Sequence, residues 1–200
     1  CIFMLPTLLN MKKSALLLTT IFLLTICCKL QAQTNDAQME AWKAYMTPGD
    51  VHKMMAKDVG KWKAEVTSWM SPDAPPSKST AECMDKMILG GRYLHQTFTG
   101  NFMGQPFEGI GTVGYDNAKK MFVSSWVDNF GTGMMYMEGP WDEATKSITF
   151  KGKCVDPMTG NDMECRQVIK FIDDKNQMME MYMTQAGKEM KTMEIKFTKQ

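Results

Sequence analysis

The chain has 200 residues, with 23 lysines and arginines against 22 aspartates and glutamates, for a formal net charge of +1. It has no basic patch and no acidic run, so the charge pattern argues against proteins that bind nucleic acid or a membrane surface. Its length suits one domain after removal of a leader.

The N-terminal segment has the pattern of a secretory leader. A short cationic start at Met11 is followed by an apolar run over 15–28 and then by the small residue Ala32. The apolar run is too short, and wrongly flanked, for a stable membrane span. We therefore expect residues 1–32 to be an upstream extension plus a signal peptide (Met11 to about Ala32), and the protein to be secreted or periplasmic.

A lipoprotein is the less favoured alternative for this segment. Lipid would attach at Cys27 or Cys28, at the end of the apolar run. Ile26 precedes Cys27 where lipid attachment usually requires Gly or Ala, so plain secretion is the stronger expectation.

Three cysteines follow the leader, an odd number that allows one disulfide and one free thiol in a secreted protein. Cys154 and Cys165 flank the turn-rich segment 155–162 and would face each other across a hairpin. A disulfide there would stabilise the fold by about 2–3 kcal/mol. Two buried, unpaired thiols are the equally weighted alternative, because cross-strand geometry is demanding. The redox state of Cys83 stays open.

Two short helices are expected before the strands begin. Apolar residues recur at helical spacing over 35–46, and Pro48-Gly49 ends this helix. The second helix has Asp50 as its expected N-cap and stops at Gly60. His52 lies on this second helix, where we expect it to serve in capping or in packing of a lid.

From Lys61 onward the apolar period changes from helical to two, and turn signals separate short segments. This pattern predicts roughly ten antiparallel strands in a barrel or a sandwich. The expected strands cover residues 61–68, a stretch ending near 89, and residues 93–102, 107–115, 121–128, 134–139, 147–154, 164–172, 178–183 and 191–198.

The glycines favour a closed sheet. Ten of the 15 lie between Gly90 and Gly139, among aromatic and β-branched residues. Glycines inside strands mark bulges, sharp bends or close approach of two backbones. So many bends in one stretch favour a sheet that curls until it closes.

Three segments together carry a family resemblance. They are His52-Lys53 followed by Gly60-x-Trp62; Gly91-Arg92 followed by Gly100-x-Phe102-x-Gly104-x-Pro106-Phe107-x-Gly109-x-Gly111; and Gly114-Tyr115-Asp116-Asn117-x-x-Lys120 followed by Trp126-x-Asp128. With them the chain resembles the bacterial domain-of-unknown-function family 1579, a lipocalin-like (calycin) group. The resemblance implies an all-β, closed, antiparallel up-and-down barrel of about ten strands over residues 60–200. It also implies that residues 33–59 form a helical segment capping the barrel, and it implies no established activity.

The resemblance gives structural roles to Gly60, Trp62 and Arg92. Gly60-x-Trp62 matches the lipocalin opening motif, in which the indole packs at the closed end of the barrel under a cation from the last strand. Such a contact is worth about 0.5–2 kcal/mol. In this chain Lys196 or Lys199 would supply the cation.

Methionine is unusually frequent. Twenty of the 22 methionines follow the leader, where only two leucines, Leu89 and Leu94, occur. The favoured interpretation is replacement of one core residue by another of similar volume. The alternative is that the runs 134–137 and 178–183 bind Cu(I) through thioethers.

Few residues suggest chemistry. His95 shares a strand face with Tyr93 and would be a haem ligand if that face points inward, although a hydrogen-bonded strand histidine is far commoner. Asp128 and Glu138, with Tyr136, would form a carboxylate pair if they face a cavity, one of them acting as the base of an isomerase or hydrolase. No known catalytic motif accompanies either arrangement.

The favoured function is binding of a small, largely apolar molecule inside the barrel. The expected lining residues are Tyr93, His95, Trp126, Asp128, Tyr136 and Glu138. We assign no catalytic residue, metal or cofactor. The alternatives are an enzyme that uses the same cavity, and a filled barrel that acts as an interaction module; the ligand and the oligomeric state stay open.

Overall fold

The computed structural model describes residues 36–71, 73–185 and 187–200. The predicted leader and the candidate lipid-attachment cysteines therefore lie outside the described residues. The chain divides into two compact units, Cys1–Thr47 and Pro48–Gln200.

In the first unit, residues 36–46 form a helix where the apolar spacing predicts one. Glu40 and Lys43 form an exposed ion pair one turn apart, with 3.8 Å between the carboxylate and the ammonium. The rings of Trp42 and Tyr45 lie edge to face, with 5.9 Å between their centroids.

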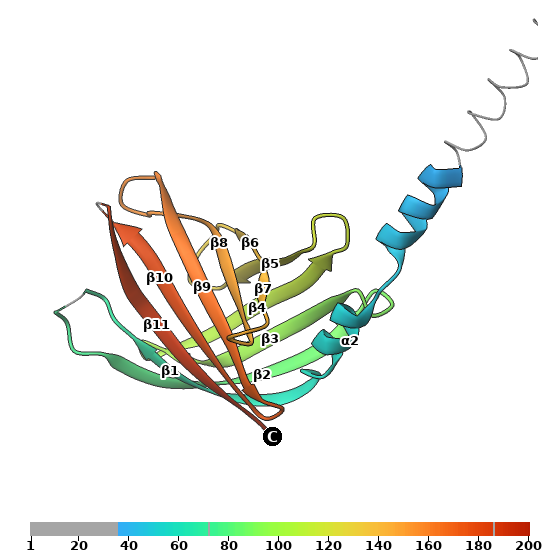
Figure 1. Cartoon of the computed structure of the whole chain (residues 1–200). Coiled ribbons are helices and arrows are strands. Elements are labelled where there is room, and N and C mark those ends of the chain that lie inside the picture. The colour runs from blue at the N-terminus through green and yellow to red at the C-terminus, as the bar shows by residue number, and fades with distance from the viewer. Residues whose placement is uncertain (1–35, 72, 186) are drawn as a thin grey trace, which may run out of the picture. The chain divides into compact units, whose positions relative to one another are not determined.

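The second unit contains one helix followed by an antiparallel sheet (Figure 1). Its elements are α2 (Asp50–Ala56), β1 (Gly60–Ser68), β2 (Ser77–Ile88), β3 (Tyr93–Phe102), β4 (Gln105–Asp116), β5 (Met121–Asp128), β6 (Met135–Gly139), β7 (Trp141–Asp142), β8 (Ser147–Val155), β9 (Asp162–Asp173), β10 (Asn176–Gln185) and β11 (Lys188–Lys199).

The sheet closes on itself. Neighbouring strands follow the order β6-β5-β4-β3-β2-β1-β11-β10-β9-β8-β7, and β6 also pairs with β8. Pro140 has no N–H to donate and separates β6 from β7, although both pair with β8. They therefore act as one interrupted strand of a ten-stranded barrel, which confirms the predicted fold class.

Alternation along the strands builds the interior. In β1, Trp62 and Ala64 are buried, whereas Lys63 and Glu65 are exposed. Because successive side chains of a strand point to opposite faces, this pattern fixes which face lies inside the barrel.

Two glycines permit the closure between β6 and β8. A Cβ atom on Gly139 would clash with the backbone of Thr149, and one on Gly152 would clash with the carbonyl oxygen of Tyr136. The backbones of the two strands approach more closely there than any other residue type allows. The predicted link between strand glycines and close backbone approach therefore holds at the point of closure.

Helix α2 packs against β3 and β4 at one end of the barrel, where Met55 joins the core. The prediction that Asp50 is the N-cap is wrong by one position, because Gly49 is the N-cap and Asp50 is the first helical residue. The physical reason is that His52 supplies the polar contact, since its Nδ1 accepts the N–H of Gly49 at 3.0 Å. Asp50 instead pairs with Lys53.

Candidate functional site

The two ends of the barrel differ in how well they are filled. Since α2 leads directly into β1, the β1–β2, β3–β4, β5–β6, β8–β9 and β10–β11 hairpins lie at the opposite end (Figure 1). Near α2 the inward side chains of Leu94, Phe122 and Ile148 are buried. Toward the hairpins the inward side chains of Phe107 and Trp126 are only half-buried. The barrel is thus packed at the α2 end and less completely filled at the hairpin end, here called the open end.

Five aromatic side chains of β3, β4, β5 and the β5–β6 loop form a continuous aromatic wall toward the open end. The ring of Phe98 meets Trp126 edge to face at 5.2 Å, and Trp126 stacks with Phe107 at 6.3 Å. Phe130 in turn contacts Phe102 at 5.5 Å and Phe107 at 5.8 Å. Pairs of this geometry add about 0.5–1.5 kcal/mol each beyond the area they bury, so these contacts hold the rings of the wall together.

Glycines of β4 make room for the centre of this wall. A Cβ atom on Gly109 would lie 2.6 Å from the Trp126 ring, and one on Gly111 would lie 3.4 Å from it. The indole therefore lies across two positions without side chains. The Gly109-x-Gly111 spacing is explained by a bulky residue on the neighbouring strand.

Asp128 holds the wall in place. Its Oδ2 accepts the indole N–H of Trp126 at 2.7 Å. Its Oδ1 accepts the backbone N–H groups of Phe130 and Gly131 at 2.9 and 3.1 Å. Both carboxylate oxygens are therefore used to orient Trp126 and the loop that carries Phe130, which is a positioning arrangement.

Of the six predicted lining residues, only Trp126 and Asp128 lie on the inner face. In β3 the buried residues are Leu94 and Phe98, so Tyr93 and His95 lie on the outer face. The ring of Tyr93 covers Gly114 there, 2.7 Å from the position of a Cβ atom.

Tyr136 and Glu138 also lie on the outer face, because Met137 between them is buried in the core. Glu138 Oε2 accepts a hydrogen bond from Lys119 at 2.9 Å. The structure therefore separates Glu138 from Asp128, and the two do not form a carboxylate pair.

Two hollows lie on the outer surface of β1–β5, since outward side chains make up most of their lining. The larger, of about 760 Å³, is lined among others by Lys61, Lys63, Glu82, Met84, Thr97 and Thr99. The smaller, of about 370 Å³, is lined among others by Thr97, Thr99, Glu108 and Ile110. Of the six predicted lining residues, Trp126 lines neither hollow and Asp128 lines the smaller one, so neither hollow is the predicted interior site.

A buried polar cluster near α2 escaped the sequence analysis. Asp85 accepts hydrogen bonds from the Cys83 thiol and from Gln96, each at 2.9 Å, and only 4% of Asp85 is exposed to solvent. Asp58 accepts one from Gln177 at 2.8 Å. The sequence does contain an indication of this cluster. Asp85 is two residues from Cys83 and so shares the inner face of β2 with it, which places a carboxyl group on an apolar face.

Burial dominates the electrostatics of this cluster. It raises the pKa of Asp58 to about 7, and the negative charge of Asp85 adds to the effect. Burial also raises the pKa of Asp85 and that of the Cys83 thiol. The thiolate, which is the reactive form of cysteine, is thereby disfavoured at Cys83.

The residues expected to be structural lie near the same end. Lys199 Nζ lies 5.3 Å from the centroid of the Trp62 ring, so Lys199 rather than Lys196 is the cation of the opening motif. The Trp62 indole N–H donates to the carbonyl oxygen of Asp58 at 2.7 Å. Arg92 donates to the carbonyl oxygen of Leu89 at 3.1 Å in the β2–β3 turn.

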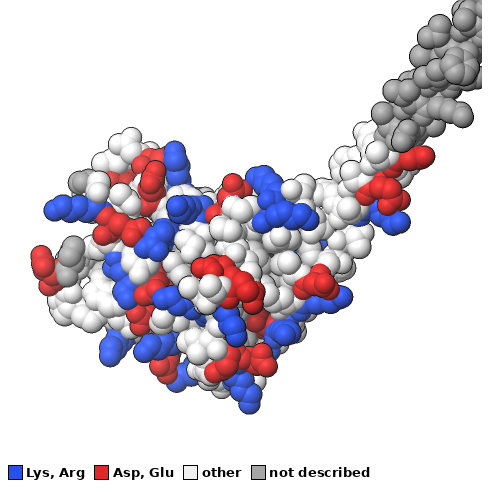
Figure 2. All heavy atoms as spheres, viewed as in Figure 1, with Lys and Arg blue, Asp and Glu red and all other residues white. Residues whose placement is uncertain are grey.

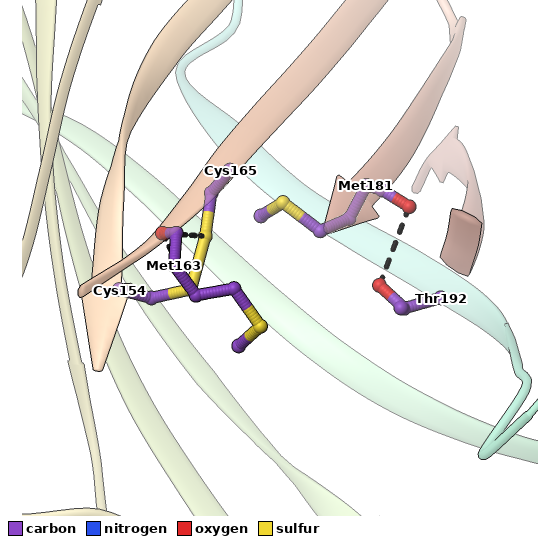
Figure 3. Close-up of a disulfide and its surroundings, with 5 residues drawn as sticks. All are labelled: Cys154, Met163, Cys165, Met181 and Thr192. Carbon is purple, nitrogen blue, oxygen red and sulfur yellow. Dashed lines mark hydrogen bonds between the residues drawn. A yellow bond between two sulfur atoms is a disulfide. The ribbon is translucent and has the colours of Figure 1, made fainter. Parts of the chain in front are cut away.

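Cys154 and Cys165 form a disulfide between β8 and β9 toward the open end (Figure 3). They are diagonal neighbours rather than directly opposed, because Cys154 pairs with Met163 and Cys165 with Gly152. The carbonyl oxygen of Met163 lies 3.6 Å from both sulfur atoms. Cys83 is the free cysteine among the described residues.

The surface charges are mixed. Figure 2 shows lysines and arginines interspersed with aspartates and glutamates over the face of the barrel in view. Within the described ranges, no group of three or more histidine, cysteine, aspartate or glutamate side chains is placed to hold a metal ion. None of the described helices has the length and apolar character of a membrane span.

Comparison with known proteins identifies a family and a shared fold. The family model described as "Protein of unknown function (DUF1579)" matches residues 47–199. The crystal structure of Rv2717c from M. tuberculosis is similar with a TM-score of 0.58 at 12% identity, over 77% of this chain and 99% of that chain. No curated protein sequence matches the chain.

Proposed function

Because the chain belongs to the DUF1579 family, whose function is unknown, we propose a function from the barrel itself: it binds a small, largely apolar molecule at the open end. The observation that carries this proposal is the half-buried aromatic wall. Phe130 is 48% exposed, and Phe102, Phe107 and Trp126 are half-buried.

Covering such rings is favourable. Removal of apolar surface from water contributes about 25 cal/mol per Å², so an apolar ligand resting on the wall gains affinity without large rearrangement. Asp128 already holds Trp126 in position, which lowers the ordering cost of binding. The ligand would lie at the open end, because the end near α2 is occupied by core side chains.

The enzyme alternative receives less support. Both oxygens of Asp128 accept hydrogen bonds from the protein itself, and Glu138 lies on the outer face beside Lys119. A base must reach its substrate within hydrogen-bonding distance, directly or through one water. Neither carboxylate is placed for that role in the barrel interior.

The binding proposal is tested with the fluorescent apolar probe 1-anilinonaphthalene-8-sulfonate. We expect saturable binding to the wild type and roughly tenfold weaker binding to Phe107→Ala, which corresponds to about 1.4 kcal/mol. Ile110→Ala is the matched control, since Ile110 lies on the same strand but on the outer face and is 45% exposed. Equal weakening by both substitutions, weakening by Ile110→Ala alone, or no saturable binding would contradict the proposal, because Ile110 lines the smaller outer hollow.

We also propose that the protein acts outside the cytoplasm, in the periplasm or after secretion. The leader pattern and the Cys154–Cys165 disulfide support this location, because disulfides persist in oxidising compartments. N-terminal sequencing of the protein from its own host tests it. A start near Gln33 supports export, and an uncut N-terminus in the cytoplasmic fraction opposes it.

A further inference from the structure

Methionines of β10 and β11 lie opposite one another on the inner face of the barrel. Met181 is buried in the core, and Met183 follows it on the same face. In the register between the two strands, Met181 is paired with Met193, and Met183 is paired with Met190. Directly opposed residues share a face of the sheet, so all four side chains lie on the inner side.

A β-bulge makes this arrangement possible. Met190 and Met193 are three residues apart and would point to opposite faces of a regular strand. The register shifts between Met181 and Tyr182, and Thr192 is the extra residue on β11. The Thr192 hydroxyl donates to the carbonyl oxygen of Met181 at 3.3 Å and fixes the bulge. Bulges re-aim side chains in this way, often beside functional sites.

The spacing suits one bound ion. Cβ atoms of directly opposed residues lie about 4.5–5.5 Å apart, and each methionine carries its sulfur two bonds further on a flexible chain. Two sulfurs bound to the same ion, with bonds of about 2.3 Å, are about 4.6 Å apart at most. The opposed pairs therefore reach this separation by side-chain rotation alone. Figure 3 shows the thioether of Met181 turned toward the Cys154–Cys165 disulfide on the neighbouring strands.

Core filling explains other methionines better than it explains Met183, Met190 and Met193. Met137 and Met179 are buried where the barrel is packed, as a filler residue should be. Met183, Met190 and Met193 instead stay half-buried toward the open end, where an ion from solvent reaches them.

The methionine runs in the sequence are not the clusters that the structure forms. Met134 lies in the β5–β6 loop and is 72% exposed, whereas Met135 belongs to β6. Met178 points to the face opposite Met179. The gathering of thioethers arises across two strands rather than along one.

We infer that Met181, Met183, Met190 and Met193, here called the thioether cluster, bind one soft monovalent metal ion, with Cu(I) as the biological candidate. Thioether sulfur is a soft ligand that selects Cu(I) over the harder divalent ions. The site needs no thiolate, so it is compatible with an intact Cys154–Cys165 disulfide. It is independent of the aromatic wall, which belongs to β3–β5.

The test uses Ag(I), a redox-inert ion of the same charge and softness, titrated into the full chain in chloride-free buffer. We expect one equivalent to bind and the ε-methyl NMR signals of the thioether cluster to shift. Met181→Leu conserves core volume and should weaken binding by about tenfold, because it removes one sulfur ligand.

Met179→Leu is the matched control, because Met179 has the same 8% exposure on the same strand face but pairs with Ile195 and Ile169. It should change affinity less than twofold. Absence of stoichiometric binding, or equal weakening by Met179→Leu and Met181→Leu, would overturn the inference. Loss of binding in Cys83→Ser would overturn it too, because the free thiol would then be the ligand.

Discussion

Replacement of Asp58 by asparagine should remove a pH dependence from the stability of the barrel. The Asp58 carboxyl accepts a hydrogen bond from Gln177 at 2.8 Å, and an asparagine side-chain oxygen can accept the same bond. The substitution keeps the shape and the contact but abolishes the ability to ionise. Asp85, Lys57 and Lys199 are the charged groups that face this position.

The size of the effect follows from the shift in pKa. Burial first, and then the charge of Asp85, raise the pKa of Asp58 from its ordinary 3.8 to about 7, while Lys57 and Lys199 oppose the rise. At about 1.4 kcal/mol for each pH unit, the shift corresponds to roughly 4 kcal/mol. The sign is set by the folded state, which binds the extra proton. The contribution of Asp58 to the free energy of unfolding is therefore fully present below about pH 4 and is lost as the pH rises through about 7.

Thermal unfolding between pH 4.5 and pH 8 measures this contribution. The wild type should lose several degrees over the range, whereas Asp58→Asn should be about 10 °C more stable than the wild type at pH 8 and similar to it at pH 4.5. Asp174→Asn is the control, since Asp174 is an exposed carboxyl in the β9–β10 loop. Parallel pH profiles for the wild type and Asp58→Asn would refute the reasoning.

Two further predictions concern packing and the disulfide. Gly109→Ala should lower the free energy of unfolding by about 1–3 kcal/mol, because its Cβ would lie 2.6 Å from the Trp126 ring. Gly133→Ala, with nothing within 4 Å, should cost much less, and equal denaturation midpoints would contradict this. Reduction of the Cys154–Cys165 disulfide should destabilise by about 2–3 kcal/mol. An unchanged midpoint under reductant, in a wild type that loses its disulfide by mass analysis, would count against that role.

Strand positions could be predicted because local patterns encode them. In β1 the alternation of Trp62 and Ala64 with Lys63 and Glu65 leaves one choice of inner face. The Gly109-x-Gly111 spacing likewise predicts close packing against these two glycines, although only the structure identifies Trp126 as the residue that packs there.

The candidate site was harder to predict because both faces of the middle strands carry mixed residues. In β3, either Tyr93 and His95 or Leu94 and Phe98 face the interior. The sequence alone does not decide which of these two alternating sets points inward. An aromatic residue also packs on the outer face, because the ring of Tyr93 covers the backbone of Gly114 there. A one-residue change of phase moves the whole set to the other face.

The polar cluster near α2 depends on contacts that no local pattern contains. Gln177 reaches Asp58 across 119 residues of chain. The thioether cluster depends on the register between β10 and β11 and on the bulge at Thr192. Register is a property of the paired sheet, so these features emerge only when the strands are assembled.

The barrel is not equally strong around its circumference. Strand β8 is joined to β6 by three residue pairs and to β7 by two, whereas β1 and β2 are joined by nine. Pro140 ends β6 at one side of this short contact. In terms of hydrogen exchange, the amides of Met137 and Gly152 should open to solvent before those of β1, because local opening takes place where the fewest contacts are broken. We therefore expect the closed barrel to open first, on slow timescales, where β6 meets β8.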